Sequence, residues 1–454
     1  MLSLPFNQLR NGFLAAVIGV MAGFAFLILL PKLSGNAYLL FGVPVAMLLL
    51  LIMVVDIQKM VLLVLFSRAL IEPLTNLSRV GGSGMGIGAL MNLFIIFLGA
   101  FLFLKEMKTV CSGQAFKSWA AFLFISFVAI GYSCVRFDAV RVFLNYISYF
   151  VMFVIPFAVI KTPVDKKNWI KILIISAVAP LFLANMDLLA GGLHEARVKG
   201  TFSHPNVLAF YLVLVISVIF YVLKSISFKT GKGMKFVLMM LMLNAFILLL
   251  ATKTRSAWVA AWLVFMTYGI LRERKYLFLA VLLPLAIMPL SSSARERVGE
   301  LFGKTSTHNS LNWRLEVWES TIPEIKKSPV WGYGLASFIP LSQHFSKHAE
   351  KFGIGTHNVY LQIAFEMGLV GLFLYLMLNW NLVLSLWKSA KLKSGPAAEP
   401  ENIIVLGLLM GYLFASASDN MLYYLVFNWY FFFFVGVVLA GSKIASLNKT
   451  GMEV

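Results

Sequence analysis

Residues 206–223 read NVLAFYLVLVISVIFYVL, a run without a charged side chain that ends at Lys224. An α-helix needs about 20 mainly apolar residues to cross the hydrocarbon core of a bilayer. Comparable apolar runs, each ended by a short polar or basic cluster, recur along the whole chain. Because lipid cannot hydrogen-bond the backbone, these runs predict membrane-spanning helices and an all-α fold.

The composition also excludes a water-soluble fold. Of the 454 residues, 60% are hydrophobic and 13% are charged, and the mean hydropathy is +0.87. Soluble domains carry about 25% charged residues.

The first apolar run ends at Pro31 without a convincing cleavage site, so we expect a retained anchor rather than a signal peptide. Cys111 and Cys134 fall at opposite ends of one predicted span, where they cannot pair, and neither belongs to a thiol or metal motif.

The apolar runs predict a polytopic protein with about 12–14 transmembrane helices. Their positions are near 12–30, 37–55, 60–74, 86–104, 119–134, 139–160, 169–190, 206–223, 236–251, 256–271, 276–290, 358 or 368 to 387, 403–418 and 424–439. The run at 60–74 is short and carries Arg68, so a half-helix is an alternative there.

Lysine and arginine predict the orientation, because they collect in the loops that stay in the cytoplasm. With fourteen spans, every basic cluster falls on the cytoplasmic side of a bacterial inner membrane, together with both termini. The clusters are Lys105, Lys108 and Lys117; Lys161, Lys166 and Lys167; Lys224, Lys229, Lys232 and Lys235; Arg272, Arg274 and Lys275; and Lys388, Lys391 and Lys393. The net charge of +19 then reflects topology and anionic lipid headgroups, and it gives no support to nucleic-acid binding.

This topology divides the chain into four parts. We expect N-terminal spans in 1–190, central spans in 191–290, a long periplasmic loop with amphipathic helices in 291–357, and C-terminal spans in 358–454. All six histidines fall in the predicted outer segments: His194, His204, His308, His344, His348 and His357. The predicted outer side is therefore where we expect the chemistry.

Four stretches on that side carry short patterns: RVKGTFSHPN (197–206), KTRSAW (253–258), NWRLEVWESTIPEIKKSPVWGYG (312–334) and GTHNVYLQIAFEMG (355–368). In order and topology they resemble the O-antigen ligase and polymerase superfamily. The matching positions are Gly200 to Asn206 with His204-Pro205-Asn206, Thr254-Arg255, Arg314-x-x-x-Trp318 leading to Pro329, Gly332 and Gly334, and His357-Asn358 with Glu366 and Gly368. The resemblance covers roughly the second half of the chain.

The resemblance implies a metal-independent glycosyltransferase without a cofactor, which takes a glycan from an undecaprenyl diphosphate carrier and attaches it to an acceptor hydroxyl. Departure of the diphosphate develops negative charge, which a guanidinium can hold bidentately. We therefore expect Arg255 and Arg314 to bind the donor diphosphate. The alternatives are a headgroup-level anchor for Arg255 and an ion pair with Glu319 or another carboxylate for Arg314.

His357 is the expected catalytic base, because an imidazole is suited to accept a hydroxyl proton near neutral pH. The alternative is a histidine that only bonds its loop to the helix that follows. Arg197, His204 and Asn358 are candidate substrate-binding residues, with a turn role as the alternative for His204.

No Asp-x-Asp pair lies in any predicted outer segment, so a divalent metal has no obvious ligands. His344 and His348 have helical metal-pair spacing but no third ligand, so we expect a solvated helix face.

Arg314 belongs to a predicted amphipathic helix that ends before Pro329. Its predicted apolar stripe, at the membrane interface or in the core, consists of Leu315, Trp318, Ile322 and Ile325.

The Thr201–Asn206 turn favours a polymerase of O-antigen or exopolysaccharide repeat units over the alternative, a ligase that transfers the finished chain to lipid A core. Expected partners are the undecaprenyl diphosphate-linked glycan, an acceptor glycan or lipid A core, and membrane lipids. A flippase or transporter would have as many spans, but it would show half-repeats and charges near the midplane. A polysaccharide-binding or scaffold protein also stays open.

Overall fold

The computed structural model describes residues 56–77, 87–110, 114–191, 197–278, 310–349, 354–391 and 399–450. The chain forms two compact units, Met1–Arg68 and Ala69–Val454. The described part of the first unit is the beginning of helix α3 (Ile57–Leu77), which is one helix of 21 residues where the sequence left a half-helix open.

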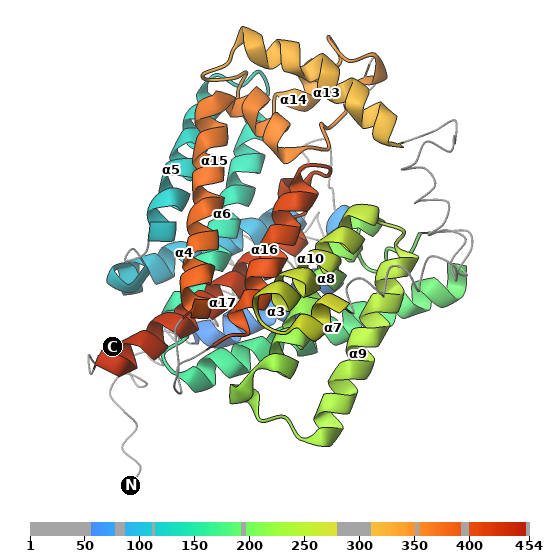
Figure 1. Ribbon diagram of the computed structural model, residues 1–454. Coiled ribbons are helices and arrows are strands. Elements are labelled where there is room, and N and C mark those ends of the chain that lie inside the picture. Colours follow the sequence, from blue (N-terminus) through green and yellow to red (C-terminus); the bar gives the residue numbers. More distant parts are fainter. Residues whose placement is uncertain are drawn as a thin grey trace, which may run out of the picture. The chain divides into compact units, whose positions relative to one another are not determined.

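All other described helices belong to the second unit (Figure 1). They are α4 (Ile87–Val110), α5 (Gln114–Gly131), α6 (Arg136–Val159), α7 (Pro163–Gly191), α8 (Pro205–Lys224), α9 (Lys232–Ala251), α10 (Arg255–Leu271), α13 (Ser310–Lys327), α14 (Phe338–Ser342), α15 (Val359–Lys391), α16 (Asn402–Ser416) and α17 (Leu425–Thr450), with short 3-10 turns η1 (Ile226–Phe228), η2 (Lys347–Ala349) and η3 (Met421–Tyr423). The described residues contain no strand, and the predicted all-α membrane fold is confirmed.

Among the described residues, six helices are long and apolar enough to cross a membrane: α6, α7, α8, α9, α15 and α17. The shorter apolar helices are parts of α4 and α5 and the whole of α10 and α16. Each of these ten coincides with a predicted span. The predicted spans 12–30 and 37–55 and nearly all of 276–290 lie outside the described residues.

The centre of the second unit is formed by α8 and α17, in each of which 94% of the apolar window is buried. Aromatic rings join the two helices: the Tyr211 and Tyr430 rings lie 5.3 Å apart, and those of Tyr221 and Phe434 lie 5.7 Å apart. By contrast, only 22% of the α9 window is buried. An exposed apolar helix face is what lipid requires of a peripheral span.

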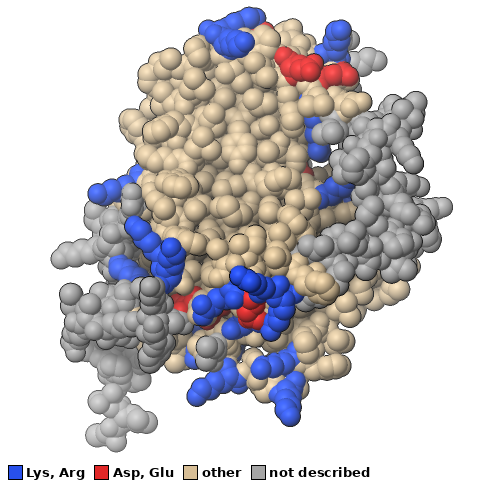
Figure 2. Space-filling view, in the orientation of Figure 1, with Lys and Arg blue, Asp and Glu red and all other residues tan. Residues whose placement is uncertain are grey.

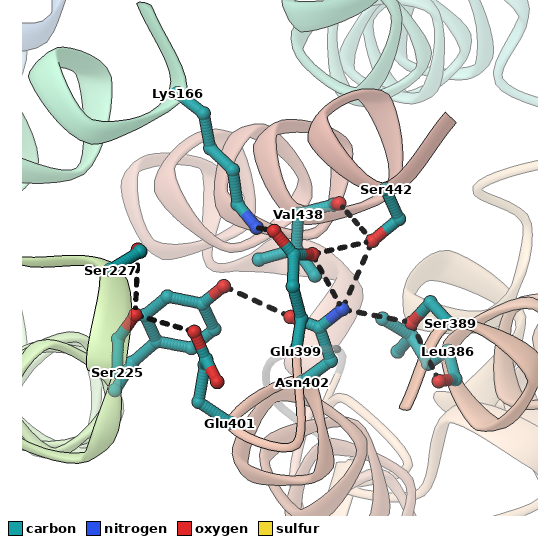
Figure 3. Close-up of polar contacts among 11 residues, drawn as sticks. Lys166, Ser225, Ser227, Leu386, Ser389, Glu399, Glu401, Asn402, Val438 and Ser442 are labelled. Carbon is teal, nitrogen blue, oxygen red and sulfur yellow. Dashed lines mark hydrogen bonds and ion pairs between the residues drawn. The ribbon is translucent and has the colours of Figure 1, made fainter. Parts of the chain in front are cut away.

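One end of the helices carries a buried polar network (Figure 3). Lys166 Nζ lies 2.5 Å from Glu399 Oε1, and both side chains are largely buried. Asn402 accepts a hydrogen bond from the Tyr221 hydroxyl at 2.9 Å and donates to Ser442 at 3.0 Å. The network thereby joins α7, α8, α16 and α17, and the hydrogen bond from Asn402 to Ser389 adds α15.

All segments in this network belong to loops or helix ends that the sequence predicts to be cytoplasmic. The segments predicted to be outer meet at the opposite ends of the same helices, where Tyr132 donates to the Trp331 carbonyl and Asn206 donates to Asp419. On the face shown in Figure 2, charged side chains gather mainly towards two ends, and the broad area between them is mostly uncharged. The assignment of one end to the periplasm rests on the positive-inside argument.

Candidate active site

The site is framed by a backbone contact between two of the motifs. The segment 329–334 lies against a break inside α15 at Gly368, whose φ is 64° and ψ −171°. Three backbone hydrogen bonds join them: Tyr333 to Phe365 at 2.9 Å, Gly334 to Glu366 at 2.8 Å, and Leu369 to Pro329 at 2.7 Å. A Cβ on Gly368 would collide with the Val330 carbonyl, and one on Gly332 with the Phe365 carbonyl. The glycines therefore permit direct backbone contact.

Helix α13 packs onto this frame and carries Arg314. Its most buried apolar residue is Val317, which forms a cluster with Phe338 and Phe365. Trp318 also joins this cluster and donates from Nε1 to the Thr356 carbonyl at 2.8 Å. The helix ends at Lys327, before Pro329, as predicted.

The predicted apolar stripe of α13 is split between two environments. Trp318 and Ile325 pack in the cluster, whereas Leu315 and Ile322 are 42% and 43% exposed. The buried face is centred on Val317, and the assignment of the exposed Leu315 and Ile322 to a membrane interface stays a prediction. Helical spacing alone did not reveal that the frame contacts only one side of the stripe.

His357 lies in the loop between this frame and the first turn of α15. Its ring packs edge-on against Trp313, with the centroids 5.3 Å apart, and its side chain is 31% exposed. Its Nδ1 lies 3.9 Å from Oδ1 of Asp419, which is an electrostatic approach rather than a hydrogen bond. Within the described residues this buried Nδ1 has no hydrogen-bond partner. Catalytic hydrogen bonds are often long without substrate and shorten when it binds.

Asp419 is a site residue that the sequence analysis missed. It is 1% exposed and lies in the short connection between α16 and α17. Its carboxylate accepts hydrogen bonds from the Tyr424 hydroxyl at 2.5 Å and from Asn206 Nδ2 at 2.8 Å. Burial alone would raise its pKa, but His357, the Tyr424 hydroxyl, the Asn420 backbone N–H and the charge of Arg314 outweigh burial and lower the pKa.

Arg197 connects this carboxylate, through Asn206, to two other segments that are predicted to be outer. Its guanidinium donates to the Thr252 carbonyl at 2.8 Å, to Asn206 Oδ1 at 2.6 Å and to Thr254 Oγ1 at 2.9 Å. These contacts fix the start of α8 against the α9–α10 connection. A substrate contact of Arg197 stays a prediction, and the contacts seen here are structural.

The two expected donor-binding arginines come from different elements. Arg255 is the first residue of α10 and directly follows Thr254, which belongs to the network around Asn206. Arg314 is close enough to lower the pKa of Asp419 through its charge. Its buried Nε has no hydrogen-bond partner among the described residues, which leaves a guanidinium donor available to an anion.

A cavity of about 320 Å³ opens between these elements. Its lining consists of His204, Asn206, Ile339, Gly355, His357, Asn420, Tyr423 and Tyr424. The structure thus brings together His204 and His357, which lie in two motifs far apart in the sequence.

A comparison with known families matches one segment of the chain. Residues 237–376 match the family model described as O-Antigen ligase. Over this segment, which is less than half of the chain, the protein is similar to the O-antigen ligase family. The matched segment includes Arg255, Arg314 and His357, and it excludes Arg197, His204 and Asp419. No curated protein matches the chain.

Asn358 opens α15 as a capping residue. Its Oδ1 accepts the backbone N–H groups of Tyr360 at 3.0 Å and of Leu361 at 3.2 Å. A carboxamide oxygen used in this way satisfies donors that the first helical turn leaves without partners. Its Nδ2 remains the group through which the predicted substrate contact would act.

His344 and His348 lie in a segment that is predicted to be outer, and they have different surroundings. His344 is exposed, and His348 Nε2 lies 2.6 Å from a Glu316 carboxylate oxygen. In the part of the chain that the structure describes, no three His, Cys, Asp or Glu side chains form a group that could hold a metal ion. The expected solvated helix face is not what the structure contains, because His348 belongs to the short turn η2 (Lys347–Ala349), whereas His344 follows the end of α14 at Ser342.

Proposed function

We propose that this chain is a glycosyltransferase that moves a glycan from an undecaprenyl diphosphate carrier to an acceptor hydroxyl on the periplasmic face, polymerising O-antigen or exopolysaccharide repeat units. The observation that carries the proposal is the position of His357, which lines the cavity and has a buried carboxylate 3.9 Å from its Nδ1. A carboxylate at Nδ1 favours the proton on that nitrogen and leaves Nε2 free to accept another.

In the proposed reaction, Nε2 of His357 accepts the proton of the acceptor hydroxyl as its oxygen attacks the anomeric carbon of the donor glycan. The bond from that carbon to the diphosphate oxygen breaks, and undecaprenyl diphosphate leaves with the electron pair. Asp419 stabilises the imidazolium that forms. Because its pKa is lowered, its carboxylate is ionised at neutral pH.

The departing diphosphate is assigned to Arg255 and Arg314. Both lie in the segment that matches the family, and the buried Nε of Arg314 supports an anion site. Fixed cations that meet developing charge lower the barrier to departure. The proposed reaction needs no divalent metal, so a chelator should leave transfer intact.

The test is transfer by the purified protein in vesicles, with lipid-linked repeat units as both donor and acceptor. The wild-type protein should form a ladder of lengthened glycans, and His357→Gln should form none, because glutamine cannot act as a base. His344→Ser is the matched control and should retain activity, because His344 is exposed and lies just after the end of α14. Full activity of His357→Gln would refute the assignment of the base.

The family description favours O-antigen ligase as the second candidate. A ligase would use the same cavity but would transfer one glycan to lipid A core. The same vesicle assay with lipid A core as the acceptor separates the two. Transfer to lipid A core without lengthening of lipid-linked repeats would show that the protein acts as a ligase and not as a polymerase.

A further inference from the structure

His204 sits at the start of α8 with an extended backbone, and its side chain caps the helix. The backbone N–H of Asn206 donates to His204 Nδ1 at 3.1 Å. An N-cap is usually a short Ser, Thr, Asp or Asn side chain, so an imidazole in this position is unusual. It places an aromatic ring with a second nitrogen at the edge of the cavity.

This hydrogen bond fixes which nitrogen of His204 carries the proton. Because Nδ1 accepts, the neutral ring must carry its hydrogen on Nε2. A charged ring would bring an Nδ1–H against the Asn206 N–H and would lose the cap. Nε2 already carries a proton, so a further proton can go only to Nδ1. Protonation of Nδ1 would make the ring a cation and would break the hydrogen bond from the Asn206 N–H.

The charged groups around His204 also favour the neutral ring. Burial, the charge of Arg197 and the neighbouring His357 lower its pKa, and Asp419 acts in the opposite direction without outweighing them. The ring is consequently neutral at pH 7 and has one fixed N–H. His357 has the complementary arrangement, since its Nδ1 faces Asp419 and its Nε2 remains as an acceptor.

We propose that His204 is a further catalytic residue, whose Nε2–H donates a hydrogen bond to an anionic diphosphate oxygen of the lipid-linked donor and keeps its proton throughout. The proposal rests on the proposed function. A neutral N–H gains most from an ionised acceptor, and the neighbouring Arg197 makes the surroundings favourable to an anion. The cavity thus holds one histidine that accepts a proton and one that only donates a hydrogen bond.

Substitutions at His204 can separate this role from capping. In His204→Ser, the hydroxyl can still accept the Asn206 N–H, but it is too short to replace Nε2. We expect the melting temperature in detergent to stay close to that of the wild type. His344→Ser is the matched control, because it removes an exposed histidine outside the site.

The primary measurement is binding of undecaprenyl diphosphate to the full-length protein, with undecaprenol, which lacks the diphosphate, as the lipid control. His204→Ser should weaken undecaprenyl diphosphate binding by about 10-fold to 100-fold, the loss expected for one hydrogen bond to a charged group, and should leave undecaprenol binding unchanged. Binding equal to that of the wild type would overturn the proposal and leave His204 as a cap.

Transfer assays on the same variants distinguish this inference from the proposed function. His357→Gln should bind undecaprenyl diphosphate normally and transfer nothing, whereas His204→Ser should be impaired in both. If the wild type binds the carrier but transfers no glycan to either acceptor, the proposed function fails, and the binding result still decides the role of His204.

Discussion

At the scale of single residues, His357 combines an unusual backbone with a polarised ring. Its φ of 49° lies in the left-handed region, which residues other than glycine seldom adopt. Such a conformation persists only when the surroundings hold it. Here the Trp313 ring and the Thr356 hydroxyl, which bonds both the N–H and the carbonyl of Asn358, hold the loop on either side.

The first prediction concerns Asp419. Asp419→Asn should lower the turnover of transfer by about three orders of magnitude, because an amide neither stabilises an imidazolium nor enforces the required tautomer. The measurement is the initial rate with lipid-linked donor, accompanied by the melting temperature to show that the protein is folded. A rate within a few-fold of the wild type would mean that Asp419 serves only the network of Asn206 and Tyr424.

The second prediction concerns pH and His204. Because the folded protein lowers the pKa of His204 from the usual 6.5, the unfolded chain binds more protons than the folded one just below that pH. The contribution of this group to stability is therefore present above pH 6.5 and is lost as the pH falls. Melting temperatures between pH 7.5 and pH 5 should fall less steeply for His204→Ser than for the wild type. Parallel curves would show that the ring does not resist protonation.

The residues of the site differ in how far the sequence could predict them. Arg255, Arg314 and His357 stand in motifs, so a pattern in one segment was sufficient to select them. Asp419 stands in no motif, and its role depends on packing between α8, the α15 loop and the α16–α17 connection. The available signal was a lone carboxylate in a short loop between two apolar spans, where an acidic group is costly unless it is paired.

At the scale of elements, the break in α15 explains two motifs together. The sequence of this span is compatible with a start at Asn358 or at Gly368, and the structure contains both: a first helical segment from Val359 and a second after Gly368. Apolar periodicity predicts that a helix exists. It does not predict a break at Gly368, where the backbone lies too close to the Val330 carbonyl of another segment for any side chain.

The third prediction tests this contact. Gly368→Ala should destabilise the protein by about 2 kcal/mol or more, because alanine is strained at a φ of 64° and its Cβ would collide with the Val330 carbonyl. Thermal unfolding in detergent is the measurement, and transfer should be lost as well. Gly233→Ala is the matched control: nothing lies within 4 Å of its added Cβ, and alanine favours a helix. Equal melting temperatures of the two variants would contradict the argument.

At the scale of the whole molecule, polar groups occupy the two ends of the helices in different ways. The end with Lys166 and Glu399 is a network whose partners satisfy one another. The opposite end contains a cavity, a histidine Nδ1 and an arginine Nε without hydrogen-bond partners among the described residues. Buried polar groups usually find partners, so unpaired ones indicate where a ligand is expected.

The fourth prediction concerns orientation and uses a native residue. Cys134 is exposed in the turn between α5 and α6, which the positive-inside argument assigns to the periplasm. In a Cys111→Ser background, it should react with an impermeant thiol reagent added to intact cells lacking the outer membrane barrier. Lys229→Cys in a Cys111→Ser, Cys134→Ser background should react only after the membrane is opened. The reverse pattern would place the cavity on the cytoplasmic face.

The contact between 329–334 and the break in α15 has a practical consequence for chimeras. Outer loops are attractive pieces to transplant between members of this superfamily when a different sugar specificity is wanted. Here, however, the loop and the helix exchange backbone hydrogen bonds, and each supplies the glycine that lets the other approach. A graft that replaces 310–349 must therefore bring residues 365–369 from the same donor protein. Otherwise the transplanted loop and the helix will not form these backbone hydrogen bonds.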